Sequence, residues 1–419
     1  MDTNHNRNKH TKGGSNTRKR SAVNTREQRR DYDYGYEEEQ QTPRRQNTAK
    51  RKLSKKQLAK KRRRKIVLFV AEVVVLLLLI IVYWGMSKVS DIQYVEIDED
   101  EIEIADEVQQ AEETGAMKGY MNVALFGVDS TTGELEKNTR TDTMIIASIN
   151  LDTKEVRMVS LYRDTYLNVG TDIYNKANSA YAKGGAKQAM SMLNMNLDMN
   201  IKYFVTSGFD ALIDVIDAVG GIEIDVKEEE IVHLNSYQVS IVGKPDGTLN
   251  AAGEPNYYAE PYVEYTPVEH AGLQTLNGLQ ATAYCRIRYV GNDFARTNRQ
   301  RTVLEKVAKK AITLNPAKLN AIAEAVFPKI STNFTLSDIV SLLGGVSDYS
   351  VAESTGFPFE GMYYTGRIGS KGSCIVPITL SDNVVKLHEF LFQEQWEPTD
   401  TVKQCSEKIK SDTSQYISY

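Results

Sequence analysis

The longest mainly apolar run of the chain spans residues 66–84, IVLFVAEVVVLLLLIIVYW, with Glu72 as its only charged residue. Nineteen residues of helix extend about 28 Å, close to the ~30 Å hydrocarbon core of a bilayer. Tyr83 and Trp84 end the run with rings that favour a membrane interface. The pattern predicts a single transmembrane helix, retained as a signal anchor because the run is too long for a signal-peptide core and no small-residue cleavage site follows.

The part of the chain after residue 118 alternates between short apolar runs and helical periodicity. The apolar runs predict strands at 121–129, 142–152, 155–164, 201–207 and 221–226. The helical spacing predicts one or two helices at 176–197 and single helices at 209–219 and 293–314. Asp293 is the predicted N-cap of the last helix. Strands that alternate with helices predict an α/β sheet layered by helices.

Less regular segments complete the pattern. Residues 231–270 are rich in Tyr, Pro, Gly and Asn and are predicted to leave the core as an excursion. A helix beginning near residue 276 is predicted to run into an arginine-rich stretch at 286–301. After residue 316 the pattern predicts further helices and strands, with a last helix near 381–393.

Charge divides the chain into two parts. Residues 1–65 hold 22 Lys and Arg against 7 Asp and Glu, a formal charge of +15, and the remainder carries −19. The segment KKRRRK at 60–65 directly precedes the apolar run, which predicts a cytoplasmic N-terminus and an external C-terminal part. The tail is polar and is predicted to be disordered. It could bind anionic lipid, but nucleic acid is not an expected partner, because no folded scaffold or interleaved aromatic residues accompany the basic run.

The chain contains three cysteines. Cys285 follows apolar residues and is predicted to be a small core residue. Cys374 and Cys405 could form a disulfide outside the cell, a pairing that the sequence leaves open. The five histidines are scattered without the spacing of zinc ligands.

Asp129 and Asp142 each stand at one end of an apolar strand. If these strands are neighbours, the two carboxylates meet at one edge of the sheet. Two oxygen ligands together with a substrate phosphate suit Mg²⁺, which keeps several waters and accepts few protein groups. The alternative is that each Asp caps a turn, and the spacing by itself favours that alternative.

The stretch RIRYVGNDFARTNRQR at 286–301 concentrates arginine in an otherwise acidic part of the chain. Arg286 and Arg288 are two residues apart and would point to the same side of an extended segment. Arg296 and Gln300 are four apart and would share a helix face. Arginine binds phosphate bidentately, and a helix start adds backbone N–H groups, so the stretch predicts an anion site.

A solvated basic helix face is the alternative for this stretch. It suits Arg299, Arg301 and Lys306. It suits Arg286 and Arg288 less well, because they directly follow the apolar ATAYC.

Further charged residues lie at the predicted strand ends. Arg163 and Asp164 close an apolar strand, where an unpaired charge would be costly, although a surface ion pair would also explain them. Arg140 is another cation, just before Asp142. The chain has no Gly-Lys-Ser/Thr phosphate loop, Gly-x-Ser-x-Gly elbow or His-Glu-x-x-His pair. Phosphate binding outside a membrane, where ATP is not expected, points to pyrophosphate-linked lipids.

Several ordered motifs between residues 120 and 310 resemble the LytR-CpsA-Psr (LCP) family of bacterial cell-wall enzymes. They are NVALFGVDS, TRTDTMIIASIN, MVSLYRDTYL, KANSAYAKGG, FVTSGFDALIDVIDAVGGIEIDV, LNGLQATAYCRIRY and NDFARTNRQR. The resemblance implies an α/β fold with a central mixed β-sheet flanked by helices, preceded here by the transmembrane helix. It also implies transfer of a glycopolymer phosphate from undecaprenyl pyrophosphate to a sugar hydroxyl of peptidoglycan, with Mg²⁺ or Mn²⁺.

The resemblance assigns roles to the charged residues. Asp129 and Asp142 look like the metal ligands. The residues that look like the pyrophosphate clamp and its surroundings are Arg163, Arg286, Arg288 and Arg296, with Gln300 beside them and Arg140 and Lys176 as further substrate-binding candidates. Asp164 would orient Arg163 or help to deprotonate the acceptor hydroxyl. The family domain also encloses an apolar pocket for the prenyl tail. Tyr162 departs from the family, which usually has proline there.

These inferences divide the chain into five segments. They are a disordered basic cytoplasmic tail (1–65), a transmembrane signal anchor (66–84), an acidic stalk (85–117), the LCP catalytic domain (118–315) and a C-terminal extracellular region without an assigned role (316–419). The large domain would therefore lie outside the cell membrane. A binding module that holds polyprenyl pyrophosphate without catalysis, or a membrane-tethered regulator of envelope biogenesis, is the alternative. Teichoic acid, capsule and other glycans all remain open as the transferred polymer.

Overall fold

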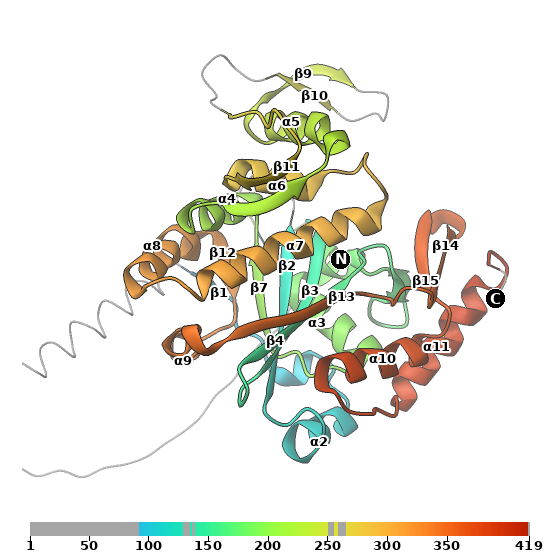
Figure 1. The fold of residues 1–419 in the computed structure, drawn as a ribbon. Coiled ribbons are helices and arrows are strands. Elements are labelled where there is room, and N and C mark those ends of the chain that lie inside the picture. Colours follow the sequence, from blue (N-terminus) through green and yellow to red (C-terminus); the bar gives the residue numbers. More distant parts are fainter. Residues whose placement is uncertain (1–91, 129–134, 136–138, 250–254, 259–264, 418–419) are drawn as a thin grey trace, which may run out of the picture. The chain divides into compact units, whose positions relative to one another are not determined.

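The computed structural model describes residues 92–128, 135, 139–249, 255–258 and 265–417 (Figure 1). Within these ranges no helix combines the length and the apolar character needed to cross a bilayer. The basic tail and the predicted transmembrane segment at 66–84 lie outside the described residues, as does Asp129.

A mixed seven-stranded sheet forms the centre of the fold, in the order β1-β12-β7-β2-β3-β4-β13. Its strands are β1 (Gln93–Tyr94), β2 (Tyr120–Val128), β3 (Thr141–Asn150), β4 (Glu155–Leu161), β7 (Tyr203–Ser207), β12 (Ile330–Thr332) and β13 (Ser350–Phe357). Strand β2 runs antiparallel to β3 and parallel to β7, and β4 runs parallel to β13. The predicted α/β class with a central mixed sheet is confirmed.

Successive side chains of each strand point to opposite faces of the sheet, because a strand has a period of two residues. On one face, residues such as Phe126, Ile146 and Phe204 join the main core. The helices that contribute to this core are α2 (Asp106–Thr114), α3 (Asn178–Leu197), α10 (Leu380–Phe392) and α11 (Asp400–Thr413). On the other face, Ile145 and Met158 pack with Leu304 of α7 (Asp293–Ala311), which lies across the strands in Figure 1. The sheet is thus covered on both faces.

A smaller apolar cluster lies beside the sheet. It joins α4 (Phe209–Ala218), β8 (Ile222–Val226), α5 (Glu228–Val242), β11 (Gly272–Leu276), α6 (Gly278–Arg286) and the inner side of α7. Strand β8 pairs only with β11 in a separate two-stranded sheet among the described strands. The predicted excursion at 231–270 is therefore partly wrong, because its first twelve residues continue helix α5; β9 (Lys244–Leu249) and β10 (Pro255–Tyr258) follow as a hairpin.

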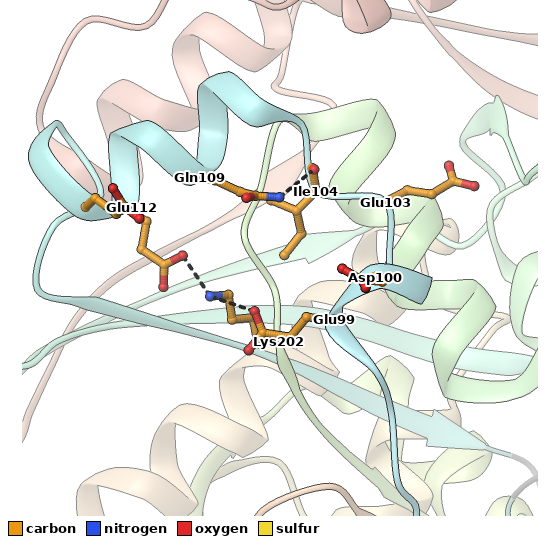
Figure 2. A pocket seen from close by; sticks show the side chains of 8 residues that line it. Glu99, Asp100, Glu103, Ile104, Gln109, Glu112 and Lys202 are labelled. Carbon is orange, nitrogen blue, oxygen red and sulfur yellow. Dashed lines mark hydrogen bonds and ion pairs between the residues drawn. The ribbon is translucent and has the colours of Figure 1, made fainter.

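The segment predicted as an acidic stalk is built into the domain from residue 92 onward. Strand β1 pairs with β12, and Val108 and Met117 are fully buried in the main core. Lys202 lies between Glu112 and Glu99, with its Nζ 2.9 Å and 3.0 Å from their carboxylate oxygens (Figure 2). The acidic residues of this segment lie on its outer side, and its apolar residues lie on its inner side. The high charge of the segment therefore suggested a free stalk.

The boundary drawn at residue 315 does not match the sheet. Strands β12 and β13 follow that residue, and β13 extends the sheet next to β4. The region also contains α8 (Pro316–Val326), α9 (Leu336–Gly344), β14 (Tyr363–Arg367), β15 (Ser373–Pro377) and the two C-terminal helices α10 and α11. Cys374 and Cys405 are buried free thiols, as is Cys285, and burial raises the pKa of Cys285 to about 12.

Strands β5 (Tyr166–Asn168) and β6 (Tyr174–Lys176) form a small hairpin after β4. Helix α3 is interrupted at Gly184 and Gly185, where Gly185 takes φ +64°, so two helical stretches meet there. Left-handed backbone at that point favours glycine.

Candidate active site

Several predicted site residues converge at one edge of the central sheet. Strands β2 and β3 are antiparallel neighbours, and Val128 at the end of β2 pairs with Thr141 at the start of β3. The predicted adjacency of these strand ends is confirmed, and Asp142 lies at this edge. Asp129, the other predicted metal ligand, is outside the described residues. Arg163 comes from the loop after β4, which is antiparallel to β3 and therefore ends at the same edge.

Asp142 is surrounded by three guanidinium groups. Its Oδ1 accepts a hydrogen bond from Nη1 of Arg163 at 2.5 Å. Its Oδ2 is 3.4 Å from Nη2 of Arg288 and 3.7 Å from Nη1 of Arg296. Burial by itself raises the pKa of Asp142, but the three positive charges outweigh it, so the pKa of this carboxyl lies below its usual range.

Arg163 links this carboxylate to two others. Its Nε is 3.8 Å from Asp164 and 3.8 Å from Asp293. Burial lowers the pKa of Arg163, but the surrounding carboxylates, with Asp142 first, raise it above its usual value. Lys176 of β6 pairs with the other oxygen of Asp164 at 3.1 Å. The structure therefore brings Arg163, Asp164 and Lys176 together, as the site prediction expected.

Arg296 is almost completely buried, with 1% of its side chain exposed. Its Nη2 lies 2.7 Å from Asp293 in the first turn of α7, yet none of its guanidinium nitrogens meets hydrogen-bond geometry with any described residue. Burial, the largest influence, lowers the pKa of Arg296, and the charge of Asp293 opposes that effect. A buried guanidinium with unfilled donors is costly unless an anion satisfies it.

The N-terminus of α7 differs from its prediction. Asn292, not Asp293, is the N-cap, and its side chain accepts from the backbone N–H of Ala295 at 3.1 Å. The side chain of Asp293 therefore does not cap the helix and instead pairs with Arg296 and Arg163. Sequence reasoning missed Asp293 as a site residue, although its spacing of three from Arg296 was a usable signal for a helical ion pair.

Gln300 follows Arg296 by one helical turn, and both side chains are buried. Its Oε1 has no hydrogen-bond partner among the residues with described placement. Gln300 and Asp142 also line a cavity of about 190 Å³ between the sheet, α4 and α7. The remaining lining is mostly apolar and includes Leu125, Leu212 and Leu304. The predicted shared face of Arg296 and Gln300 is confirmed, and Gln300 on that face lines the apolar cavity.

Arg286 does not form the extended pair with Arg288 that its spacing predicted. It is the last residue of α6, and its guanidinium lies over the ring of Phe209 at 4.6 Å and near Tyr237 at 5.7 Å. Phe209 lines the apolar cavity, so Arg286 borders that space through the ring. Arg140 is exposed immediately before β3.

Two arginines assigned to the helix surface are placed differently. Arg299 is buried and pairs with Glu230 of α5 at 2.8 Å. Arg301 is half-buried, and burial lowers its pKa. Lys306 is exposed, as expected. The partner of Arg299 lies sixty-nine residues earlier, so helical periodicity carried no signal for this pair.

The described carboxylates do not complete a metal site by themselves. No group of three or more His, Cys, Asp or Glu side chains suited to a metal ion occurs among the described residues. Asp142 is the one predicted ligand that can be placed. Its Oδ1 is bonded to Arg163, whereas its Oδ2 has the looser contacts and could accept a cation.

A model of the LytR_cpsA_psr family matches residues 81–368 of the chain. The chain belongs to this family. The resemblance seen in the sequence motifs is thus confirmed. The matched range also extends well past residue 315, in agreement with the membership of β12 and β13 in the central sheet of this LytR_cpsA_psr protein.

Curated relatives of this LytR_cpsA_psr protein include teichoic acid transferases. The polyisoprenyl-teichoic acid–peptidoglycan teichoic acid transferase TagU of Enterococcus faecalis is 28% identical over 296 residues, 68% of this chain and 84% of the relative. TagT of Bacillus subtilis, a transferase of the same description, is 27% identical over 266 residues, 61% of this chain and 75% of the relative. Biofilm regulatory protein A of Streptococcus mutans is 32% identical over 239 residues, 53% of this chain and 52% of the relative.

Solved structures share the fold. Protein gbs0355 of Streptococcus agalactiae has a TM-score of 0.52 and 26% identity, covering 70% of this chain and 93% of that one. A transcriptional regulator of Enterococcus faecalis has a TM-score of 0.50 and 25% identity, covering 72% and 96%. These matches agree with a mixed sheet flanked by helices.

Proposed function

We propose that the protein is a phosphotransferase that moves a glycopolymer phosphate from polyprenyl pyrophosphate to a sugar hydroxyl of peptidoglycan. Relatives named as polyisoprenyl-teichoic acid–peptidoglycan teichoic acid transferases support this reaction class. Undecaprenyl is the lipid that we propose, and a teichoic acid is the favoured polymer because those relatives carry that name.

One observation carries the proposal: a cluster of arginines adjoins the apolar cavity. Arg163, Arg288 and Arg296 all face Asp142, and Asp142 itself lines the cavity. A polyprenyl pyrophosphate has an anionic head joined directly to an apolar chain, so it needs these two surfaces side by side. The buried guanidinium of Arg296 would gain from the head the hydrogen bonds that it lacks in the described residues.

The proposed reaction exchanges one P–O bond for another. The hydroxyl oxygen of the acceptor bonds to the phosphorus that carries the glycopolymer. The bond from that phosphorus to the bridging oxygen breaks, and the lipid leaves as polyprenyl monophosphate. The hydroxyl proton passes to Asp164. Among the described residues, its Oδ2 is 3.8 Å from Arg163, whereas its Oδ1 pairs with Lys176 at 3.1 Å. The arginines stabilise charge on the transferred and leaving phosphates, and positioning supplies most of the acceleration.

A divalent ion, Mg²⁺ or Mn²⁺, is part of the proposal. Asp142 would hold it through Oδ2, with Asp129 as the second protein ligand, and substrate oxygens would complete its shell. When bound, such an ion neutralises phosphate charge. We also propose that residues 66–84 anchor the protein in the cell membrane, with residues 1–65 in the cytoplasm and the folded domain outside.

The test is transfer of a labelled lipid-linked glycan to peptidoglycan oligomers by the full-length protein in detergent. We expect transfer with Mg²⁺ and loss of transfer with a chelator. Arg288→Ala should lower kcat/KM about 100-fold or more, the effect of removing one charge-stabilising donor. Lys306→Ala is the matched control, because it removes an exposed cation from the same helix that carries Arg296 and should leave the rate unchanged.

Other results would identify the alternatives. Tight binding of the lipid-linked donor without transfer to any acceptor would favour the non-catalytic binding module. Salt-dependent binding of nucleic acid by the full-length protein, lost when residues 1–65 are removed, would favour a regulator. Full activity of Arg288→Ala would show that the arginine cluster has been assigned wrongly.

A further inference from the structure

Three aromatic side chains meet directly beside the arginine cluster. Tyr162, Phe294 and Tyr363, here called the aromatic cluster, come from the start of the loop after β4, the first turn of α7 and the start of β14. Phe294 and Tyr363 stack with ring centroids 4.9 Å apart, and the ring of Tyr162 meets Phe294 edge-on at 4.6 Å. All three side chains are half-buried, so part of each remains accessible to solvent.

The aromatic cluster is fixed to the candidate active site by the chain itself. Tyr162 immediately precedes Arg163, and Phe294 immediately follows Asp293, which pairs with Arg296. Tyr363 belongs to the β14–β15 hairpin, whose Ile375 donates its N–H to the carbonyl of Asp164 at 2.9 Å. The region after residue 315 therefore contributes directly to the surroundings of the site.

Tyr162 stands where the family usually has proline, and the fold makes room for it. A Cβ added to Gly356 of β13 would lie 2.1 Å from the Oη of Tyr162, so the neighbouring strand accommodates the ring by carrying glycine there. The N–H of Tyr162 also donates to the carbonyl of Phe357 at 2.9 Å. The position of the ring is thus determined by β13 and by Phe294.

We propose that Tyr162, Phe294 and Tyr363 form a stacking surface for the sugar ring of the acceptor glycan. A sugar ring has a face of C–H groups and a rim of hydroxyl groups, and the negative face of an aromatic ring attracts the former. The exposed carboxylate of Glu360 acts electrostatically on both tyrosines and offers an acceptor for the hydroxyl rim. This inference rests on the proposed transfer reaction, because it concerns the sugar whose hydroxyl attacks.

The order of the strands favours the aromatic cluster as a surface for the acceptor sugar rather than for the donor. The apolar cavity lies against β7, β2 and the start of β3, whereas the aromatic cluster lies at the ends of β4 and β13. Asp142 and Arg163 stand between them. In a phosphoryl transfer the attacking and leaving oxygens are roughly in line on opposite sides of phosphorus. With the lipid in the cavity, the attacking sugar belongs on the side of the aromatic cluster.

Two measurements on the full-length protein in detergent test this inference. The first is binding of soluble peptidoglycan oligomers, followed by calorimetry without any donor. The second is the transfer rate as a function of oligomer or of donor concentration. Tyr363→Ala should weaken oligomer binding and raise the KM for oligomer about two- to tenfold, the range of an aromatic contact of ~0.5–1.5 kcal/mol. The KM for the donor should not change.

Matched variants separate ring stacking from folding. Tyr363→Phe keeps the ring and should bind oligomer nearly as well as the original protein. Tyr364→Ala removes the next ring along β14, which points to the other side of the strand, and should bind normally. Both variants and Tyr363→Ala should unfold at similar temperatures.

The results of these two measurements distinguish failure of this inference from failure of the proposed transfer reaction. Weaker oligomer binding by Tyr363→Ala in a protein that transfers nothing would support the sugar surface and reject the transferase. Normal oligomer binding by Tyr363→Ala, or no oligomer binding by the unaltered protein, would overturn the inference. A raised KM for the donor alone would also overturn it.

Discussion

Arg299 of α7 and Glu230 of α5 form a buried ion pair with 2.8 Å between Nε and Oε1. The same guanidinium donates to the carbonyls of Ile287 at 3.2 Å and Val290 at 2.8 Å. Arg288 lies between those two carbonyls in the chain. The pair therefore holds the loop that carries one of the three arginines around Asp142, although neither partner touches Asp142 itself.

Removing the carboxylate of this pair should destabilise the fold. We expect Glu230→Ala to lower the free energy of unfolding by about 3–5 kcal/mol, because it leaves Arg299 buried without its countercharge. Urea denaturation measures the change. Glu229→Ala, which alters the exposed neighbour on the same helix, should change stability by less than about 0.5 kcal/mol. Equal effects of the two substitutions would contradict the role of the pair.

Asp142 should make stability depend on pH in the acidic range. Its folded pKa is depressed, so its contribution is present above its unfolded pKa of about 3.9 and is lost as pH falls through the folded value. The stability difference between the unaltered protein and Asp142→Asn should be constant from about pH 7 to pH 5 and should shrink below about pH 4. Urea denaturation across that range tests this prediction. A stability difference that grows on acidification would contradict a depressed folded pKa of Asp142.

Replacing Arg296 should separate activity from stability. Its pKa is lowered by burial, so the folded environment disfavours its charge. We expect Arg296→Met to lower kcat/KM about 100-fold or more while leaving the free energy of unfolding unchanged or higher, because Asp293 is partly exposed and keeps Arg163 as a countercharge. Transfer assays and urea denaturation of the same preparation measure the two effects. A loss of several kcal/mol in stability would show that Arg296 supports the fold rather than the anion.

Filling the apolar cavity should act on the donor. We expect Leu304→Phe to raise the KM for the lipid-linked donor about tenfold, because the larger ring takes space that the lipid would occupy. Overpacking should cost no more than about 1–3 kcal/mol of stability. Val340→Phe places the same ring on an exposed position of α9 and serves as the control. An unchanged donor KM with a correctly folded Leu304→Phe would place the lipid elsewhere.

The two proposed metal ligands, Asp129 and Asp142, can be tested by metal titration. Asp129→Asn and Asp142→Asn should each raise the Mg²⁺ concentration needed for half-maximal transfer, because each removes a proposed anionic ligand. Asp152→Asn, in the turn at the opposite end of β3, should leave it unchanged. An unaltered Mg²⁺ requirement in both site variants would argue against the pair as ligands.

Much of the fold and part of the site could be predicted from local pattern. Apolar runs located the central strands β2, β3, β4 and β7, and helical spacing located α4 and α7. The motifs indicated the family and nominated Arg163, Asp142 and Arg296. These features depend on residues close together in the chain, where strand and helix periods relate sequence directly to geometry.

The tertiary structure decided the contacts between distant residues. It pairs Arg299 with Glu230, turns Arg286 onto Phe209 and adds β13 to the sheet. None of these follows from a period, because each depends on how separate elements pack and on which buried charges require partners. The sequence by itself determined the α/β elements, the family motifs and the kind of chemistry. Packing decided which arginines face Asp142 and which one supports the loop that carries Arg288.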